Sequence, residues 1–320
     1  MAPHSSPDTR LVTDVGGTNT RIALFDPEAN ELRALATYRN RDHAQFEDVI
    51  ALWLASLSEP APPSCCIAVA APPADDRVSM VNIDWSFSCR ELAARFGFSR
   101  LGWINDFQAN AYALPHLGRE DRDELQAGRQ DANGKLATVG PGTGLGGSTL
   151  EWMARTPYAR ACEPGHMGLS PATALELELF RVLLPRHGEI HAELLVSGPG
   201  LQRLHQALGE VRGELPPTRS AADISSSAQQ GQDELSVLAL NTFCALLGSV
   251  CGDFMLANGA YGGLYLAGGI VPRMIPFLRA SSFARRFRDK GAMCEHLGAV
   301  PIYAITAAQP GLLGAAHAPL

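Results

Sequence analysis

Several features that would indicate a function directly are missing from this chain of 320 residues. No apolar run approaches the ~18 residues of a membrane-spanning helix, and the opening MAPHSSPDTR has no apolar centre like that of a signal peptide. Basic residues are outnumbered, with 26 Lys and Arg against 33 Asp and Glu. This acidic balance gives no support for a nucleic acid or an anionic membrane as partner. We expect a cytoplasmic protein.

Cysteine motifs are also scarce. The chain has 7 cysteines, an odd number, and none stands in a C-x-x-C pair. Cys65 and Cys66 lie in an apolar run, and Cys244 and Cys251 lie in a helical pattern. The pattern favours buried free thiols in a reducing compartment over a disulfide or metal framework.

The hydrophobic pattern predicts an α/β protein with two lobes. In the first third, apolar or alternating segments predict strands at 11–15, 21–25, 32–38, 65–71 and 101–106, and helical spacing predicts helices at 43–57 and 88–98. The second part opens with strand, glycine turn and strand at 136–150, continues with helices at 173–185, 199–209, 221–229 and 233–258, and returns to a strand at 263–267. The unit at 136–150 repeats the organisation of 11–24, which suggests two related lobes with a boundary in the charged stretch 117–135.

The first glycine turn carries an acidic residue at the end of a buried strand, in Asp14-Val15-Gly16-Gly17-Thr18. Glycines let backbone N–H groups converge on an anion, and a neighbouring carboxylate then implies a divalent cation, so Asp14 suggests magnesium beside phosphate. A plain β-hairpin turn, with Asp14 as a turn acceptor, explains the same residues equally well.

A second glycine turn, GPGTGLGG at 140–147, has five glycines in eight residues, more than a hairpin needs. It lacks the Gly-Lys-Ser/Thr of a Walker loop and the helix that follows a dinucleotide fingerprint. Gly268 and Gly269 follow a third strand and precede a helix, where they allow either the close approach of an adenosine or tight strand–helix packing.

Three further polar groups stand out. Asn105 and Asp106 end a strand that we expect to be buried; they suit a polyol hydroxyl and the removal of its proton, although Asp106 also suits a helix N-cap. Glu163 and His166 are spaced like metal ligands on a helix, but Pro-Gly lies between them, so a loop that holds sugar hydroxyls is the better interpretation. Glu193 completes the acidic set, or is a solvated helix residue.

Taken together, the motifs DVGGTNTR, INDFQANAYAL, GPGTGLGGS, EPGH, LLVSGPGL, GGLYLAGGIVPR and PGLLGAA resemble the bacterial ATP-dependent glucokinases. That family belongs to the sugar kinase, actin and heat-shock-chaperone ATPase superfamily. The resemblance runs nearly end to end. It implies a two-lobed actin-like, ribonuclease H-like α/β fold: a small lobe at 1–116 to which a final helix at 307–320 returns, and a large lobe at 117–306. ATP, Mg²⁺ and glucose would meet in the cleft between the lobes, and the family suggests a homodimer.

The resemblance also assigns roles. It implies a first phosphate loop of Thr13, Asp14, Val15, Gly16, Gly17 and Thr18, with Asp14 near magnesium. It implies a second loop containing Gly142, Thr143 and Gly144, and an adenosine segment at Gly268 and Gly269. The implied glucose contacts are Asn105, Asp106, Glu163, His166 and Glu193, with Asp106 as the catalytic base.

The chain departs from the family pattern at two places. Pro164 stands where the family usually has glycine, and the segment 71–80 lacks a glycine that often precedes the N-x-x-W element, although Asn82 and Trp85 are present. Two rival functions share the fold. A sugar-sensing regulator would need a DNA-binding module, for which only about ten residues precede the first strand, and a non-sugar ATPase would not need the polar groups above.

Overall fold

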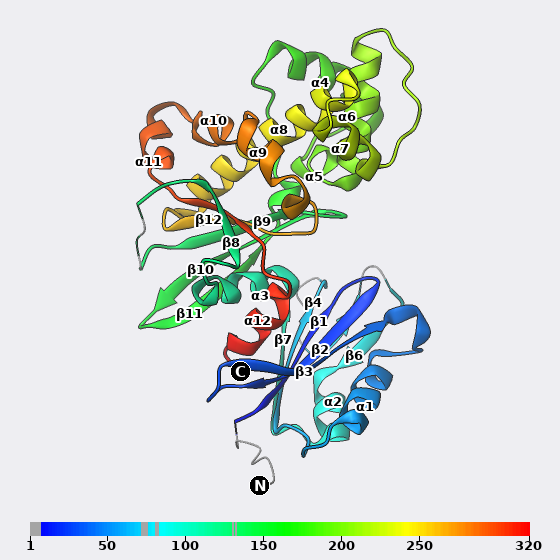
Figure 1. The fold of residues 1–320 in the computed structure, drawn as a ribbon, viewed down its shortest axis with the longest axis vertical. Coiled ribbons are helices and arrows are strands. Elements are labelled where there is room, and N and C mark those ends of the chain that lie inside the picture. The colour runs from blue at the N-terminus through cyan, green and yellow to red at the C-terminus, as the bar shows by residue number, and fades with distance from the viewer. Residues whose placement is uncertain (1–7, 72–75, 81–82, 130, 132) are drawn as a thin grey trace. The chain divides into compact units, whose positions relative to one another are not determined.

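The computed structural model describes residues 8–71, 76–80, 83–129, 131 and 133–320. The chain forms two compact units, Met1–Leu117 with Ala308–Leu320, and Gly118–Ala307 (Figure 1). Each unit is built on its own main sheet.

The main sheet of the first unit has the strand order β3-β2-β1-β4-β7. Its strands are β1 (Arg10–Val15), β2 (Asn19–Asp26), β3 (Glu31–Arg39), β4 (Ser64–Val69) and β7 (Arg100–Asn105), while β5 (Arg77–Ser79) and β6 (Ser86–Ser88) pair separately. β1 is antiparallel to β2 and parallel to β4, so the predicted mixed sheet is confirmed. The expectation that 101–106 is buried was wrong, because β7 is an edge strand and its residues are only half-buried or exposed.

Helices cover both faces of this sheet: α1 (Phe46–Ser56), α2 (Cys89–Phe96), α3 (Asp106–Ala113) and α12 (Pro310–His317). α1 contributes Phe46 and Trp53 to a core that includes Leu11 and Ile22. α3 and α12 pack so closely that a Cβ on Gly314 would overlap the carbonyl of Ala109. Trp85 is buried in the same unit. Asn82 and residues 72–75 of the unusual segment lie outside the described residues.

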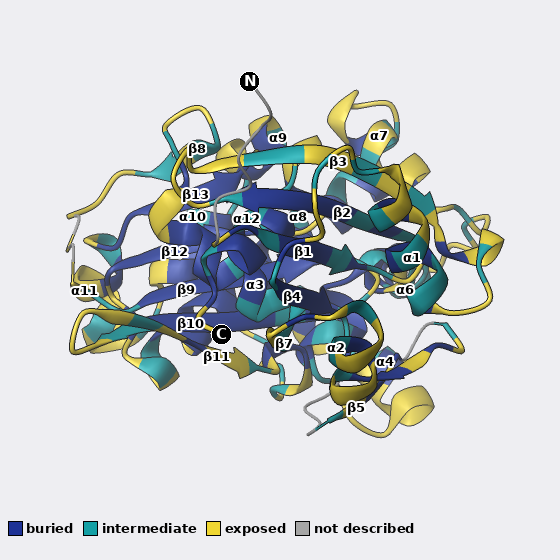
Figure 2. Ribbon diagram, turned by 90° about the horizontal axis from the view of Figure 1, so that it is seen from below, coloured by how far each residue is buried: buried dark blue, intermediate teal, exposed yellow. Residues whose placement is uncertain are grey.

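The second unit repeats the strand order of the first, as β11-β10-β9-β12-β13, and adds β8 at the edge. Its strands are β8 (Arg122–Gln126), β9 (Leu136–Pro141), β10 (Leu145–Met153), β11 (Thr156–Cys162), β12 (Gly263–Leu266) and β13 (Ile302–Ile305). β9 is antiparallel to β10 and parallel to β12, as β1 is to β2 and β4. Strands β4, β9 and β12 are buried along their whole length (Figure 2).

The helices of the second unit are α4 (Ala174–His187), α5 (Ala192–Leu195), α6 (Gly198–Val211), α7 (Ala221–Gln229), α8 (Glu234–Asn258), α9 (Ile275–Ala280), α10 (Phe283–Arg288) and α11 (Cys294–Gly298). The four predicted long helices all form. α8 is long and apolar enough to cross a membrane, but 83% of that window is buried inside the protein, as in a core helix. Gly248 and Gly252 let α8 approach the carbonyls of Phe283 and Phe287 on α10.

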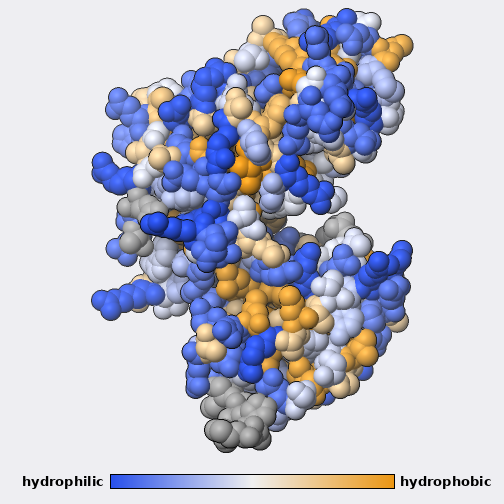
Figure 3. Space-filling model, viewed as in Figure 1, coloured by the Kyte–Doolittle hydropathy of each residue, from blue (hydrophilic) through white to orange (hydrophobic). Residues whose placement is uncertain are grey.

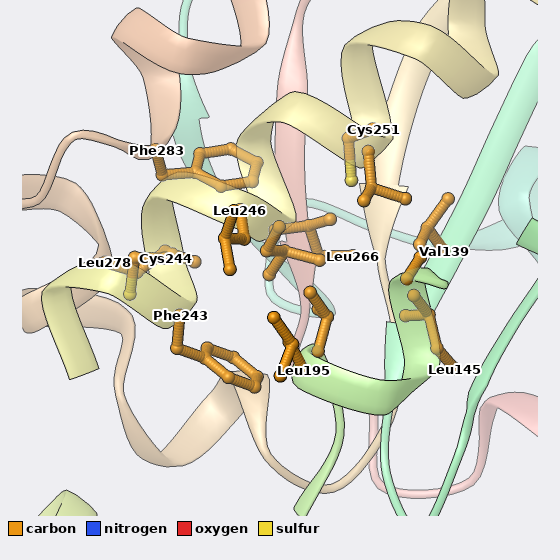
Figure 4. Close-up of a cluster of buried hydrophobic side chains, with 14 of the residues drawn as sticks. Val139, Leu145, Leu195, Phe243, Cys244, Leu246, Cys251, Leu266, Leu278 and Phe283 are labelled. Atoms are coloured by element: carbon orange, nitrogen blue, oxygen red, sulfur yellow. The ribbon is translucent and has the colours of Figure 1, made fainter. Parts of the chain in front are cut away.

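The core around α8 joins the sheet to the helical layer. Phe243, Leu246 and Cys251 of α8 point into the same cluster as Leu266 of β12 and Phe283 of α10 (Figure 4). Hydrophobic residues form small groups among hydrophilic ones on the face in Figure 3. All seven cysteines are free, whereas the expected burial holds for four of them: Cys65, Cys66, Cys244 and Cys251. Cys294 is exposed.

Candidate functional site

The first glycine turn joins β1 to β2 and is braced by a residue that sequence patterns did not point to. The Gly16 N–H donates to the Asn19 carbonyl at 3.0 Å. The buried Asn40 donates its side-chain amide to the Gly16 carbonyl at 2.7 Å and its backbone N–H to the Thr18 carbonyl at 2.9 Å. Thr20 in turn donates its hydroxyl to Asn40 Oδ1 at 2.8 Å. Both ends of the turn are therefore fixed while Gly17 and Thr18 remain exposed.

Asp14 lies at the end of β1 in a largely desolvated position. Its Oδ2 accepts a hydrogen bond from Arg21 Nη1 at 3.1 Å, and its side chain is 20% exposed. Burial raises the pKa of the Asp14 carboxyl, and the Arg21 guanidinium opposes that rise. A Cβ on Gly311, in the first turn of α12, would lie 2.9 Å from the Asp14 carboxyl carbon. The carboxylate therefore also faces the positive end of α12.

Magnesium prefers oxygen ligands and, with a nucleotide, needs only one or two carboxylates beside phosphate and water. Among the described residues no group of three His, Cys, Asp or Glu side chains gathers to hold a metal ion. The described residues therefore contain no metal site in which protein side chains supply all the ligands. Asp14, a hard oxygen donor with Arg21 bound to one oxygen, fits the single-carboxylate mode.

The strand β7 ends in the Asn105-Asp106 pair, and the structure assigns the helix cap to the first of them. Asn105 Oδ1 accepts from the Phe107 N–H at 2.8 Å, and Gln108 Oε1 accepts from the Asn105 N–H at 3.0 Å, which completes a capping box. The idea that Asp106 is the N-cap was wrong. Asp106 is instead the first residue of α3, where its carboxylate also accepts from Phe107 N–H at 3.0 Å.

The second glycine turn joins β9 to β10 and is held from outside its own sheet. Within the turn, the Gly142 N–H donates to the Gly144 carbonyl at 2.8 Å. The Gly198 N–H, at the start of α6, donates to the Gly142 carbonyl at 2.8 Å. Glu193 Oε2 on α5 accepts from the Leu145 N–H at 2.8 Å. Glu193 is thus a partner of the turn rather than a freely solvated helix residue.

Gly268 follows β12 beside this turn. Its φ of +86° is strained for any residue with a Cβ, and a Cβ there would lie 2.6 Å from the Pro141 carbonyl oxygen. Gly269 has no atom within 4 Å of such a Cβ. Tight packing therefore explains Gly268, whereas nothing in the described protein requires glycine at 269.

The second unit contains a pocket of about 750 Å³ at the second glycine turn. Its lining residues are Gly142, Thr143, Gly198, Pro199, Leu201, Gln202, Ala221, Ala222, Ser225, Ser226, Gln229, Gln230, Ile270 and Arg273. Sequence patterns assigned Gly142 and Thr143 to a ligand but gave no such role to the lining from α6 and α7, although the motif LLVSGPGL contains the start of α6. The mixture of apolar walls, amides and hydroxyls suits a flat, polar-edged ligand.

The Glu163–His166 segment forms a short 3₁₀ turn, Pro164–His166, rather than an α-helix. Pro164 occupies the first position of that turn, where its missing N–H costs nothing. Its buried ring packs over Gly147 of β10, so closely that a Cβ on Gly147 would lie 2.7 Å from Pro164 Cγ. Glu163 and His166 are exposed. The loop therefore accommodates proline.

The structure brings Glu193 to this loop as well. A Cβ on Gly165 would lie 3.1 Å from Glu193 Oε2, and the rings of His166 and His191 have centroids 5.7 Å apart. Glu163, His166 and Glu193 thus belong to one region of the second unit, whereas Asn105 and Asp106 belong to the first unit.

Comparisons with known proteins identify the family. The family described as Glucokinase matches residues 11–319. A glucokinase of Aromatoleum aromaticum is 40% identical over 310 residues, covering 97% of this chain and 94% of that protein. A crystal structure of glucokinase from an Antarctic psychrotroph matches with a TM-score of 0.90 at 38% identity, covering 97% of this chain and 98% of that one. A ROK family glucokinase from Streptomyces griseus in complex with glucose and AMPPNP has a TM-score of 0.63 at 19% identity over 96% and 98% of the two chains, a likeness of fold alone. The chain belongs to the glucokinase family of enzymes.

Proposed function

We propose that this protein transfers the γ-phosphoryl group of ATP to the 6-hydroxyl of D-glucose, giving glucose 6-phosphate and ADP, as a cytoplasmic homodimer acting in glycolysis. The observation that carries the proposal is the family match over residues 11–319, within which every motif of the candidate site is present. The proposal includes a two-lobed actin-like fold with the reaction in the interlobe cleft. The repeated strand order of the two main sheets supports this duplicated architecture.

The nucleotide would bind with its adenosine in the pocket of the second unit. Leu201, Ala221 and Ile270 offer apolar walls for the base, and Ser225 and Gln229 offer polar groups for its edge. The N-terminus of α6 lies at the same pocket, and its positive partial charge favours the phosphates. Gly142, Thr143 and Gly144 would follow the phosphate chain, with Gly268 and Gly269 beside the adenosine.

The first turn, from Thr13 to Thr18, would hold the terminal phosphate. Its Gly17 and Thr18 backbone is exposed, and Asn40 fixes its shape before any ligand arrives. Magnesium held near Asp14, directly or through water, would neutralise charge on the phosphates.

The sugar would be held by Asn105, Asp106, Glu163, His166 and Glu193, whose acceptors match the donors of vicinal hydroxyls. Asp106 would accept the proton of the 6-hydroxyl as that oxygen attacks the phosphorus atom and the bond from phosphorus to the bridging oxygen of ADP breaks. Because phosphoryl transfer has a loose transition state, most of the catalysis lies in positioning and in charge neutralisation.

The direct test is ADP release by purified protein with ATP, Mg²⁺ and a panel of hexoses. We expect ADP release that depends on glucose and is weaker with fructose and N-acetylglucosamine. ADP release that no sugar stimulates would contradict the kinase assignment and favour a non-sugar ATPase. Glucose binding without any turnover would favour a sugar sensor.

A further inference from the structure

Two loops with different assigned ligands meet at one side chain in the second unit. The loop 163–169 belongs to the proposed sugar site, and the turn 142–145 belongs to the proposed nucleotide site. Glu193 of α5 contacts both. Its carboxylate accepts from the Leu145 N–H at 2.8 Å, and its Oε2 would lie 3.1 Å from a Cβ on Gly165 and closer still to a Cβ on Gly144.

The backbone around Glu193 is fixed on the side of the sugar loop. Gly168 and His191 form an isolated antiparallel bridge, and the Leu169 N–H donates to the Ile190 carbonyl at 3.0 Å. The Ala192 N–H donates to the Met167 carbonyl at 2.9 Å. Movement of the sugar loop therefore moves the start of α5.

The same short helix is fixed on the side of the glycine turn. Ser197 donates its hydroxyl to the Glu193 carbonyl at 2.8 Å, and the next residue, Gly198, donates its N–H to the Gly142 carbonyl. The side chains of Leu145 and Leu195 lie in one buried cluster with Val139 and Leu266 (Figure 4). The turn is thus held at Gly142 and at Leu145, and only the second hold depends on a side-chain carboxylate.

We infer that Glu193 is a positioning residue for the nucleotide as well as a sugar contact: it fixes the second glycine turn, so that sugar binding and nucleotide binding are coupled through α5. The inference rests on the proposed function. A carboxylate that accepts a backbone N–H holds it in one orientation, and hydrogen bonds to charged groups are stronger than those between neutral groups. A sugar contact alone would leave the turn unaffected.

The experiment measures the affinity of AMPPNP with Mg²⁺ by calorimetry, first without sugar. Glu193→Ala should weaken AMPPNP binding about tenfold, which corresponds to the loss of ~1.4 kcal/mol. Glu193→Gln keeps an acceptor of the same reach and should remain within about threefold of wild type. Glu193→Asp keeps the charge but is shorter, and should behave like Glu193→Ala. Unchanged AMPPNP affinity in both Glu193→Ala and Glu193→Asp would overturn the inference.

Two control variants separate this effect from general loss of charge or of sugar binding. Glu189→Ala removes an exposed acid four residues away and should change the affinity for neither ligand. Glu163→Ala removes an acid for which the described residues show no side-chain hydrogen bond to the glycine turn. It should weaken the binding of glucose but not the binding of AMPPNP.

A second measurement needs no ligand. Hydrogen–deuterium exchange of the segment 142–146 should quicken in Glu193→Ala and stay near wild type in Glu193→Gln; unchanged exchange in Glu193→Ala would count against the inference. With glucose present, wild type should bind AMPPNP several-fold more tightly, and Glu193→Ala should lose that gain. A wild-type protein that binds AMPPNP but not glucose would refute the proposed function, while the sugar-free comparison would still test the fixing of the turn.

Discussion

The two glycine turns stand at equivalent places in the two sheets, yet they are supported in opposite ways. The β1–β2 turn is braced by Asn40, which follows the neighbouring strand β3, and carries its own acid, Asp14, on the strand. At the equivalent strand position the second unit has Val139, and the acid comes from Glu193 on a helix. The first turn is therefore formed by its own sheet, whereas the second depends on α5 and α6.

Both strands keep a threonine at the same place before the turn. Thr13 and Thr138 are fully buried, and their hydroxyl groups have no hydrogen-bond partner among the described residues. In each unit the residue after the neighbouring parallel strand donates to the strand before the turn, since the Ala70 N–H donates to the Val15 carbonyl and the Ala267 N–H donates to the Val139 carbonyl. The two units thus differ in the strand residue that follows the threonine, Asp14 or Val139, and in the residues that surround the turn.

The largest effect should come from Asp106 in the first unit. Asp106→Asn keeps the size of the side chain but makes a poor base, so turnover should fall by about 10³-fold, within the range for general bases, while glucose still binds. In the second unit Glu163→Gln should mainly raise the KM for glucose. Steady-state kinetics and glucose calorimetry on both variants check this. Near-normal turnover of Asp106→Asn would place proton removal elsewhere.

Asp14 should give the next largest effect. Asp14→Asn removes the charge assigned to magnesium and breaks the pair with Arg21. Turnover should fall about tenfold or more, a loss of ~1.4 kcal/mol or more in the transition state, with a raised Mg²⁺ requirement. Glucose affinity without nucleotide should be nearly unchanged. A variant whose sole defect is weak glucose binding would disprove the metal assignment.

Local patterns were enough to predict the strands and turns at the candidate site, but not the side chains from other elements that hold the turns in place. An apolar strand that runs into glycines is visible over ten residues, so β1, β2, β9 and β10 could be predicted. The contact of Glu193 with Leu145 joins residues 48 positions apart, and no local pattern encodes it. Asn105 and Asp106 both suit a cap, and side-chain geometry decided between them. β8, β11 and β13 went unpredicted.

The roles of the site residues could not be predicted from local patterns, because these roles come from the family resemblance. Neither the strand pattern nor the folded units say which acid removes a proton. Asp106 and Glu193 remain predictions that the variants above test.

Gly268 and Gly269, which follow β12 in the second unit, should differ in how much their substitution affects stability. Gly268→Ala adds a Cβ at a φ of +86° and against the Pro141 carbonyl, so the second unit should lose about 2–3 kcal/mol in its free energy of unfolding. Gly269→Ala meets no atom within 4 Å and should be nearly neutral for stability. Urea unfolding of the pair measures the difference. Equal stabilities would mean that the turn at Pro141 moves freely.

Acid should weaken the first unit through α12. His317 stacks on His116 with centroids 3.4 Å apart, near Arg10, and burial with these cationic neighbours lowers the pKa of His317 to about 4. The unfolded chain takes up a proton near pH 6.5 and the folded chain only near pH 4, so stability is full above pH 6.5 and falls between these values. The partly exposed ring limits the loss to about 2 kcal/mol.

The measurement is the free energy of unfolding from pH 7 to pH 4 in wild type and in His317→Gln. The variant should lose much of the histidine-dependent slope, because it has no ring to protonate. A pH profile identical to that of wild type would show that other groups cause the acid sensitivity, and that α12 does not respond to these histidines.

The smallest effect is expected at Pro164, where the second unit departs from the family pattern. Pro164→Gly removes a ring that packs on Gly147 and gives the unfolded chain more freedom, so stability should fall by about 0.5–1 kcal/mol. The 3₁₀ turn needs no N–H from residue 164, so Glu163 and His166 should keep their positions. Preference for glucose over fructose and N-acetylglucosamine, measured as kcat/KM ratios, should therefore be unchanged. A switch in preferred sugar on this one change would show that Pro164 shapes the sugar site, and that glucose is not the native substrate.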